Sequence, residues 1–232
     1  MQPVCYNLAP ARPCGGPHAC DMKTIIQCDF DGTITEDDAS FYLLDAYAQG
    51  DWRTILEEYK EGRITVGDFN TRAFAMIHED EETLLHKLDE HVRIRPGFRT
   101  LIDYCKYRGM RFVIVSNGLQ FYIEAILRAL GIKGVEVHAA TNAFLPEGVK
   151  VQYVGPDGTV LQDGFKEAYT KLYLSQDYRV VYVGNGVSDS YASRHAHVVF
   201  ATGDLLNFYK TRGMECIPFD DLTQVVSGLA KL

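Results

Sequence analysis

The stretch from Ile25 to Asp38 constrains the fold more than any other part of this chain. It begins as an apolar run of strand-forming residues and ends in two carboxylates, Asp29 and Asp31, with one residue between them. In a parallel sheet, ligands bind beyond the carboxyl ends of the strands. A strand that delivers acids to its own end therefore predicts an active site at that edge of a sheet.

The rest of the chain alternates between strand and helix patterns. Apolar runs predict further strands at 111–115, 135–141 and 179–183, and weaker ones at 197–200 and 215–217, with helical patterns between them. This alternation is typical of a doubly wound parallel sheet, so we predict an α/β fold. Two short runs around Gly155-Pro156-Asp157-Gly158 predict a hairpin, which we expect to form a small flap on the third strand.

Residues 37–93 interrupt this alternation. Apolar residues recur there at spacings of three and four, in segments separated by glycines and an acidic run. Short amphipathic helices of this kind pack into a bundle. We therefore predict a helical cap at 37–93, inserted into a core domain formed by 22–36 and 94–232.

Two sets of cap residues have more than one interpretation. Asp37 and Asp38 lie where the cap begins, where they could face the entrance of the site or simply begin a helix, since helix N-termini favour acids. The aromatic residues lie at helical spacing, so we expect them in the core of the bundle rather than around a substrate. They are Tyr42, Trp52, Tyr59 and Phe74.

The composition is that of a globular protein, with 47% hydrophobic residues in a chain of 232. A net charge of −8 argues against a nucleic-acid partner, which would need a basic face. It is compatible with an anionic substrate where a metal ion supplies positive charge. The sequence has neither an apolar run that could span a bilayer nor a signal-peptide pattern at its N-terminus. We expect a cytoplasmic protein without a membrane partner, and no pattern indicates an oligomeric state.

Residues 1–21 are rich in Pro, Gly, Ala and Cys, and we expect them to form a flexible tail. Three cysteines there, with His18, raise the possibility of a metal cluster, but their spacing matches no paired zinc pattern. These three are Cys5, Cys14 and Cys20. The other cysteines stand singly in apolar surroundings and are typical of small buried residues. They are Cys28, Cys105 and Cys216.

Polar residues follow three of the predicted strands and begin one helix. In chain order they are Asp29, Asp31, Ser116, Asn117, Gly118, Lys166, Asn185 and Asp189. Neighbouring carboxylates repel unless a cation joins them, and oxygen ligands suit Mg²⁺. Acids, a magnesium site, a hydroxyl and a lysine together suit phosphoryl transfer through an aspartyl intermediate. We expect the phosphate to accept hydrogen bonds from backbone N–H groups at residues 30–33, the last of which is Thr33, and at residues 117–118.

These motifs resemble those of the haloacid dehalogenase superfamily, and in particular its aspartate-nucleophile phosphatases. Asp29 to Thr33 is similar to the first motif, Ser116 to the second, Lys166 to the third and Gly184 to Asp189 to the fourth. The resemblance covers nearly the whole chain from residue 23 onward. It implies a Rossmann-like core with an inserted helical cap, as in the phosphoserine phosphatase-like branch.

Within that branch, this chain is most similar to the methionine-salvage phosphatases that act on 2-hydroxy-3-keto-5-methylthiopentenyl-1-phosphate. The similarity rests on Asp-Phe-Asp-Gly-Thr-Ile-Thr, on Arg95 to Phe98 and on the hairpin before Lys166. Cap residues select the substrate in such enzymes. Phosphoserine, a phosphorylated salvage ketone, pyridoxal phosphate and phosphocholine-type esters therefore all stay open as substrates.

The resemblance also implies a role for each residue. Asp29 would be the nucleophile, Asp31 the general acid and base, and Lys166 the cation that neutralises nucleophile and phosphate. The phosphate would be bound by Thr33, Ser116, Asn117, Gly118 and Lys166. The ligands of Mg²⁺ would be Asp29, the backbone carbonyl of Asp31, Asn185 and Asp189.

Asn185 departs from the family pattern, which usually has an aspartate as a direct Mg²⁺ ligand at this position. The amide oxygen of Asn185 can still bind the ion, but it brings no charge. We favour a working enzyme because the other motifs are intact. The alternative is a catalytically weak or inactive phosphate-binding or regulatory protein. Asp31 and the metal-binding motif disfavour a dehalogenase, and the cap disfavours a phospho-acceptor signalling domain.

Overall fold

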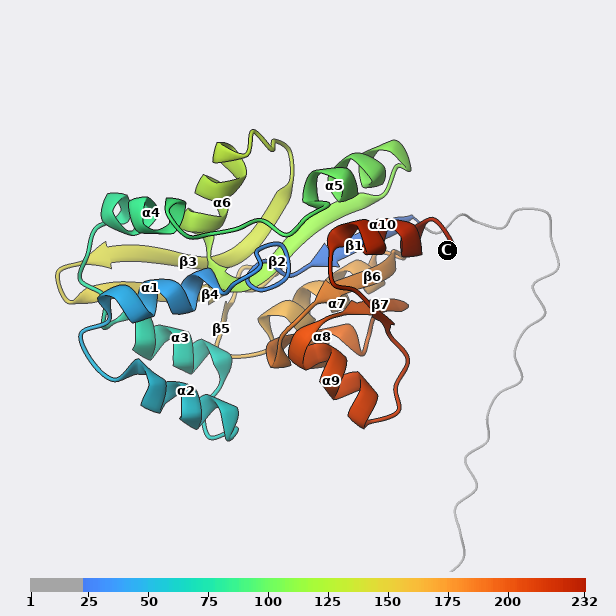
Figure 1. Ribbon diagram of the computed structural model, residues 1–232. Coiled ribbons are helices and arrows are strands. Elements are labelled where there is room, and N and C mark those ends of the chain that lie inside the picture. Colours follow the sequence, from blue (N-terminus) through green and yellow to red (C-terminus); the bar gives the residue numbers. More distant parts are fainter. Residues whose placement is uncertain (1–22) are drawn as a thin grey trace, which may run out of the picture.

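A computed structural model describes residues 23–232, in which one eight-stranded sheet is covered by helices on both faces (Figure 1). The strands are β1 (Thr24–Cys28), β2 (Arg111–Leu119), β3 (Glu136–Leu145), β4 (Gly148–Val154), β5 (Val160–Leu161), β6 (Arg179–Gly184), β7 (Val198–Ala201) and β8 (Ile217–Pro218). Their order in the sheet is β5-β4-β3-β2-β1-β6-β7-β8. Strands β3, β2, β1, β6, β7 and β8 run parallel, and β4 and β5 are antiparallel additions.

The helices are α1 (Ala39–Tyr47), α2 (Trp52–Lys60), α3 (Val66–Phe74), α4 (Glu81–Asp89), α5 (Phe98–Tyr107), α6 (Gln120–Ala129), α7 (Phe165–Ser175), α8 (Ser190–Ser193), α9 (Gly203–Thr211) and α10 (Leu222–Leu229), with a 3₁₀ turn η1 at Val187–Asp189. In Figure 1, α5, α6 and α10 lie on one side of the sheet and α7, α8 and α9 on the other. The predicted α/β fold with a mostly parallel sheet is therefore confirmed.

The central strands are apolar because both of their faces are covered. Ile25, Ile26 and Cys28 of β1 are completely buried, as are Val113 to Val115 of β2. Burial on both faces gives a continuous apolar run rather than an alternating one, which is why these strands could be read from the sequence. Cys105 is buried as expected, and Cys216 is partly exposed. The tail at 1–21 and its possible cysteine cluster lie outside the described residues.

Helices α1 to α4, here called the cap helices, occupy the segment predicted as the cap. Each begins at a side chain that accepts a hydrogen bond from a backbone N–H of its first turn. These N-terminal residues are Asp38, Asp51, Thr65 and Asp80. In α3 the bonding is reciprocal, because the Asp68 side chain also accepts from the backbone N–H of Thr65. The division of the chain at 37 and 93 stays a prediction.

The predicted hairpin is confirmed, because β4 and β5 pair antiparallel on either side of residues 155–158, but the third strand is longer than expected. The third strand was expected to end at Thr141, but β3 continues to Leu145 and pairs along this outer half with β4. The outer end of β4 lies against the cap helices, where the Val149 N–H donates to the Ile77 carbonyl at 3.1 Å. The outer half of β3 is partly exposed, so it lacks the apolar run that marks the central strands. The hairpin is thus joined to the third strand through β4, as expected, and β3 and β4 together form an arm of the sheet that contacts the cap segment.

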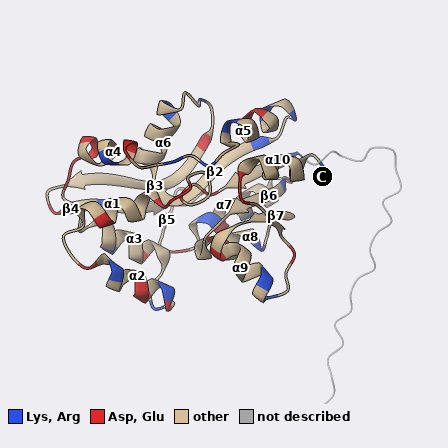
Figure 2. Ribbon diagram, viewed as in Figure 1, with Lys and Arg blue, Asp and Glu red and all other residues tan. Residues whose placement is uncertain are grey.

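Charged residues are distributed over many elements of the described chain. Figure 2 shows acidic and basic positions interspersed along the helices and loops. Across residues 23–232, every helix falls short of the length and apolar character that a membrane span requires.

Candidate active site

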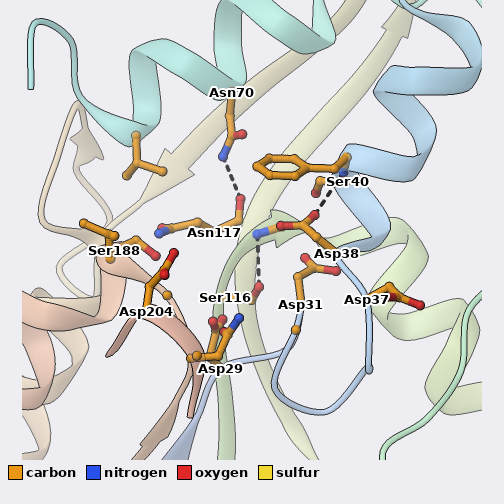
Figure 3. A pocket seen from close by; sticks show the side chains of 18 of the residues that line it. Asp29, Asp31, Asp37, Asp38, Ser40, Asn70, Ser116, Asn117, Ser188 and Asp204 are labelled. Carbon is orange, nitrogen blue, oxygen red and sulfur yellow. Dashed lines mark hydrogen bonds between the residues drawn. The ribbon is translucent and has the colours of Figure 1, made fainter. Parts of the chain in front are cut away.

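A cavity of about 530 Å³ lies beyond the carboxyl ends of β2, β1 and β6, beneath the cap helices. These three strands are neighbours in the sheet, so residues far apart in the sequence meet at their ends. Asp29, Asp31, Ser116, Lys166 and Asn185 all line the cavity. Figure 3 shows Asp29, Asp31 and Ser116 around one space, which lies at the predicted edge of the sheet.

Lys166 joins two buried carboxylates. Its Nζ lies 2.7 Å from Asp29 Oδ1 and 2.7 Å from Asp189 Oδ1. Burial lowers the pKa of Lys166, but the charges of Asp189 and Asp29 outweigh this effect and raise the pKa above its ordinary value. Burial and the charge of Asp189 raise the pKa of Asp29 to about 7, although Lys166 opposes the rise. A cation bound at Asp29 would lower that pKa and favour the nucleophilic carboxylate.

Asp189 is completely buried and lies outside the set of residues that line the cavity. Its Oδ1 accepts from Lys166 and from the Tyr182 hydroxyl, each at 2.7 Å. Its Oδ2 accepts from the backbone N–H groups of Asn185 at 3.0 Å and Gly186 at 2.8 Å. Both oxygens are thus engaged in holding Lys166 and the loop after β6. Direct Mg²⁺ ligation by Asp189, as predicted from the sequence, would require one of these bonds to break.

Thr33, predicted to bind phosphate, lies next to Asn185 rather than at the cavity wall. It is completely buried and lies outside the set of residues that line the cavity. Its hydroxyl donates to Asn185 Oδ1 at 2.8 Å, and its backbone N–H donates to the Phe30 carbonyl at 3.1 Å. Gly32, with φ +70°, turns the chain so that Thr33 points at Asn185. In this structure Thr33 orients the Asn185 amide, and its role in phosphate binding stays a prediction.

Asp31 lines the cavity two residues after Asp29. Its Oδ1 accepts from the Ala39 N–H at 3.1 Å, and its Oδ2 accepts from the Tyr122 hydroxyl at 2.5 Å. Burial and the charge of Asp38 raise the pKa of Asp31 well above its ordinary value, against the effect of the Tyr122 bond. A carboxyl group with a raised pKa suits a general acid near neutral pH.

The end of β2 carries Ser116, Asn117 and Gly118. The strand was expected to stop at Val115, but it continues to Leu119 with a register shift against β3. The irregularity brings Ser116 and Asn117 to the cavity wall. The Gly118 N–H donates to Ser116 Oγ at 3.0 Å, so the structure uses this predicted phosphate donor to orient the serine.

The cap helices close the cavity with a mostly apolar wall. The apolar and aromatic residues of this wall are Phe41, Leu56, Tyr59, Val66 and Phe69, and Ser40, Lys60 and Asn70 are its polar members. Trp52 and Phe74 are buried as expected, and Tyr42 stacks on His91 at 4.4 Å between ring centroids. Tyr59 was also expected inside the bundle, but it lines the cavity and stacks on Phe69. Asp37 and Asp38 line the cavity, and Asp38 also caps α1, so both of its interpretations hold.

Several supporting residues were missed from the sequence. Gln27, completely buried in β1, donates to the Lys166 carbonyl at 3.0 Å and accepts from Thr170 at 2.8 Å, which fixes the start of α7. Arg95 donates to the Gly32 and Thr33 carbonyls, each at 2.8 Å, and so holds the first motif. A glutamine inside an apolar strand is a readable signal, whereas the contacts of Arg95 depend on the three-dimensional fold.

Asn70 ties the cap helices to the second motif. Its Nδ2 donates to the Asn117 carbonyl at 3.0 Å, as drawn in Figure 3, and to the Tyr153 hydroxyl. Tyr153 donates to the same carbonyl at 2.6 Å. Asn70 is only 5% exposed, so α3, β2 and β4 meet at a buried polar junction. A polar residue at a helical core position was its only sequence signal.

The donor set of the cavity fits Mg²⁺. Three residues that line the cavity offer oxygen atoms as ligands. They are Asp29 with its carboxylate, Asp31 with its backbone carbonyl and Asn185 with its side-chain amide. Mg²⁺ prefers oxygen ligands and is often held by one or two carboxylates, with water and substrate phosphate completing its shell. Within residues 23–232, no group of three or more His, Cys, Asp or Glu side chains is placed to hold a metal ion by itself.

Comparison with known proteins agrees with this geometry. The model of the haloacid dehalogenase-like hydrolase family matches residues 26–194. The 2-hydroxy-3-keto-5-methylthiopentenyl-1-phosphate phosphatase of Bacillus pumilus is 24% identical over 196 residues, or 83% of this chain and 84% of the relative. The enzyme of the same name from Exiguobacterium sibiricum is 26% identical and covers 90% of this chain and 97% of the relative.

Solved structures with a similar fold include phosphoserine phosphatases. A phospho-aspartyl intermediate analogue of phosphoserine phosphatase aligns with a TM-score of 0.65 at 19% identity, covering 89% of this chain and 99% of the other. Phosphoserine phosphatase from T. onnurineus aligns with a TM-score of 0.65 at 19% identity, covering 94% and 100%. At this level of identity, the similarity supports the fold.

Proposed function

Because the chain belongs to the haloacid dehalogenase-like hydrolase family, we propose that it is a Mg²⁺-dependent phosphatase that hydrolyses a small-molecule phosphate monoester through an aspartyl phosphate. The observation that carries this proposal is the buried Asp29–Lys166 pair at the wall of the cavity. A two-step phosphoryl transfer needs a nucleophile and a general acid. A carboxylate paired with a cation suits the first role, and a neighbouring acid with a raised pKa suits the second.

In the proposed reaction, Asp29 attacks phosphorus and Asp31 protonates the departing alkoxide. Asp31 then takes a proton from the water that hydrolyses the aspartyl phosphate. Lys166 and Ser116 contact the phosphoryl oxygens, and Asp189 holds Lys166 in place. Asp29, the Asp31 carbonyl and Asn185 would hold Mg²⁺, which supplies positive charge against the phosphate.

The cap helices favour a substrate whose alcohol part is partly apolar. Phe41, Leu56 and Val66 face the cavity and offer apolar surface to the group that is bound to the phosphate. The relatives from Bacillus and Exiguobacterium are named for a methylthiopentenyl phosphate, which carries such a chain. We therefore favour a methionine-salvage type of substrate over phosphoserine. The cytoplasmic location expected from the sequence is compatible with this role and stays a prediction.

A second candidate is a phosphate-binding or regulatory protein with little or no turnover. The observation that favours it is Asn185, which brings an uncharged amide oxygen to the proposed metal site. The Thr33 hydroxyl already donates to that oxygen and reduces its capacity as a ligand. This candidate predicts that the protein binds phosphate esters without hydrolysing them.

The two candidates are separated by turnover with Mg²⁺. We expect the purified protein to hydrolyse p-nitrophenyl phosphate and to act best on a methylthio-substituted phosphate ester in a screen that includes phosphoserine. Asp29→Asn should abolish turnover, while Asp103→Asn, an exposed acid on α5, should preserve it. Turnover by the Asp29→Asn variant at the wild-type rate would disprove the proposed mechanism. Ester binding without any turnover would favour the second candidate.

A further inference from the structure

Two buried hydroxyl groups form a hydrogen-bonded chain that ends on Asp31. The Tyr122 hydroxyl donates to Asp31 Oδ2 at 2.5 Å, and Ser40 Oγ lies 2.8 Å from the Tyr122 oxygen. Tyr122 is completely buried, and Ser40 is 6% exposed. Because a tyrosine has a single hydroxyl proton, Ser40 must be the donor in the second bond while Tyr122 donates to Asp31.

The chain links three elements that are distant in the sequence. Ser40 lies in the first turn of α1, Tyr122 lies in α6, and Asp31 follows β1. The other carboxylate oxygen of Asp31 accepts from the Ala39 N–H at 3.1 Å. Each oxygen therefore has its own donor, and together these donors fix the plane of the carboxyl group. Both donors come from outside the motif that contains Asp31.

The surroundings leave little room for this carboxyl group to move. A Cβ atom at Gly118 would overlap both the Tyr122 hydroxyl and Asp31 Oδ2, so the backbone of β2 packs directly against their hydrogen bond. The Tyr122 ring packs against Phe30 and Phe121, with centroids 6.4 Å and 5.4 Å away. A phenylalanine would fill the same space, so packing alone does not account for the hydroxyl.

We propose that Tyr122, supported by Ser40, is a positioning residue that orients Asp31 toward the leaving-group oxygen of the substrate. This inference rests on the proposed function, because it takes Asp31 as the group that protonates the leaving alkoxide. Tyr122 lies outside the set of residues that line the cavity, so it acts through Asp31 rather than by binding the substrate.

The proposal predicts an effect that depends on the leaving group. Tyr122→Phe should lower kcat/KM for alkyl phosphates about tenfold or more, because Asp31 loses the donor that orients it and that stabilises its carboxylate as the proton leaves. The same variant should retain most of its kcat/KM for p-nitrophenyl phosphate, because p-nitrophenolate leaves without a proton. Ser40→Ala should show a weaker effect of the same kind. It should add little to Tyr122→Phe, because both residues act through one chain.

A matched control is available in Tyr209. Its buried hydroxyl donates to Ser193 Oγ at 3.0 Å, in a separate apolar cluster. Tyr209→Phe removes the same kind of bond and should leave both activities at the wild-type level. Asp31→Asn serves as the reference, and adding Tyr122→Phe to it should cause no further loss on alkyl phosphates.

The outcomes distinguish a failure of the proposed function from a failure of the role of Tyr122. If the wild-type protein shows no turnover with Mg²⁺, or if Asp29→Asn has no effect, the proposed function fails and the role of Tyr122 fails with it. If the wild type is active and Asp29→Asn is not, the role of Tyr122 is tested alone. Wild-type kinetics of Tyr122→Phe on both esters, or an equal loss on both, would then overturn it.

Discussion

Lys166 and Asp189 form an ion pair that is almost completely closed to solvent. Nζ and Oδ1 are 2.7 Å apart, and the two side chains are 4% and 0% exposed. Breaking a buried pair by removing one partner is costly because the other charge stays buried. Loss of Asp189 should therefore disturb Lys166 and, through it, the arrangement of Asp29, the proposed nucleophile.

Asp189→Asn should lower both stability and activity. We expect the free energy of unfolding to fall by about 1.5–3 kcal/mol, because the buried donors around Asp189 lose a charged acceptor while Lys166 stays paired with Asp29. Urea denaturation of the full chain measures this change. Glu61→Gln is the control, because it removes an exposed ion pair with Arg63 that is worth less than about 1 kcal/mol. Equal small losses in the two variants would contradict the structural importance of the buried pair.

Asp38→Asn should stabilise the protein at neutral pH. Burial raises the pKa of Asp38 to about 6, although backbone N–H groups of α1 oppose the rise. In the unfolded chain its pKa is about 4, so between about pH 4 and 6 the unfolded state loses its proton first. Protonated Asp38 therefore makes its full contribution to the free energy of unfolding at about pH 4. This contribution is lost as the pH rises through about 6.

An asparagine can cap α1 as well as an aspartate does, and it carries no charge. The gain from Asp38→Asn should be about 1–3 kcal/mol at neutral pH and close to zero at about pH 4. Thermal unfolding at the two pH values measures it. Asp80→Asn is the matched control, since Asp80 caps α4 on the surface and its pKa is lowered. A gain of the same size at both pH values would refute the assignment to the Asp38 charge.

Asn185→Asp should strengthen Mg²⁺ binding. The substitution adds a negative charge at the cavity wall, while the Thr33 hydroxyl can still donate to the new carboxylate. We expect the dissociation constant for Mg²⁺, measured by titration calorimetry, to fall about tenfold or more. Asp204→Asn, which removes a charge elsewhere on the cavity wall, should change the affinity much less. Unchanged affinity in Asn185→Asp would exclude this position from the metal site.

The sequence was sufficient for the central part of the molecule. The buried strands are continuous apolar runs, and the residues at their ends had to converge once the sheet was parallel. The sequence therefore predicted that Asp29, Ser116 and Asn185 lie at one edge of the sheet. In the structure all three line the cavity at that edge. The family match confirms the resemblance on which their roles were assigned.

The remaining features depend on contacts that no local pattern encodes. The outer half of β3 is stabilised by its pairing with β4, so its own residues give a weak signal. Thr33 is turned toward Asn185 by the conformation of Gly32, which a motif does not reveal. Tyr122 has the spacing of an ordinary core residue, and only the approach of α6 to the first motif gives its hydroxyl a partner.

The arm formed by β3 and β4 has a mechanical consequence. Because α3 is bonded to this arm and to β2, a rigid swing of α3 away from the sheet would break the buried junction at Asn70. It would also strain the Val149–Ile77 bond at the tip of the arm. These hydrogen bonds thus restrict the motion of the cap helices on the side of the β3–β4 arm. An opening that exchanges a substrate for its product without breaking these bonds has to begin away from the β3–β4 arm.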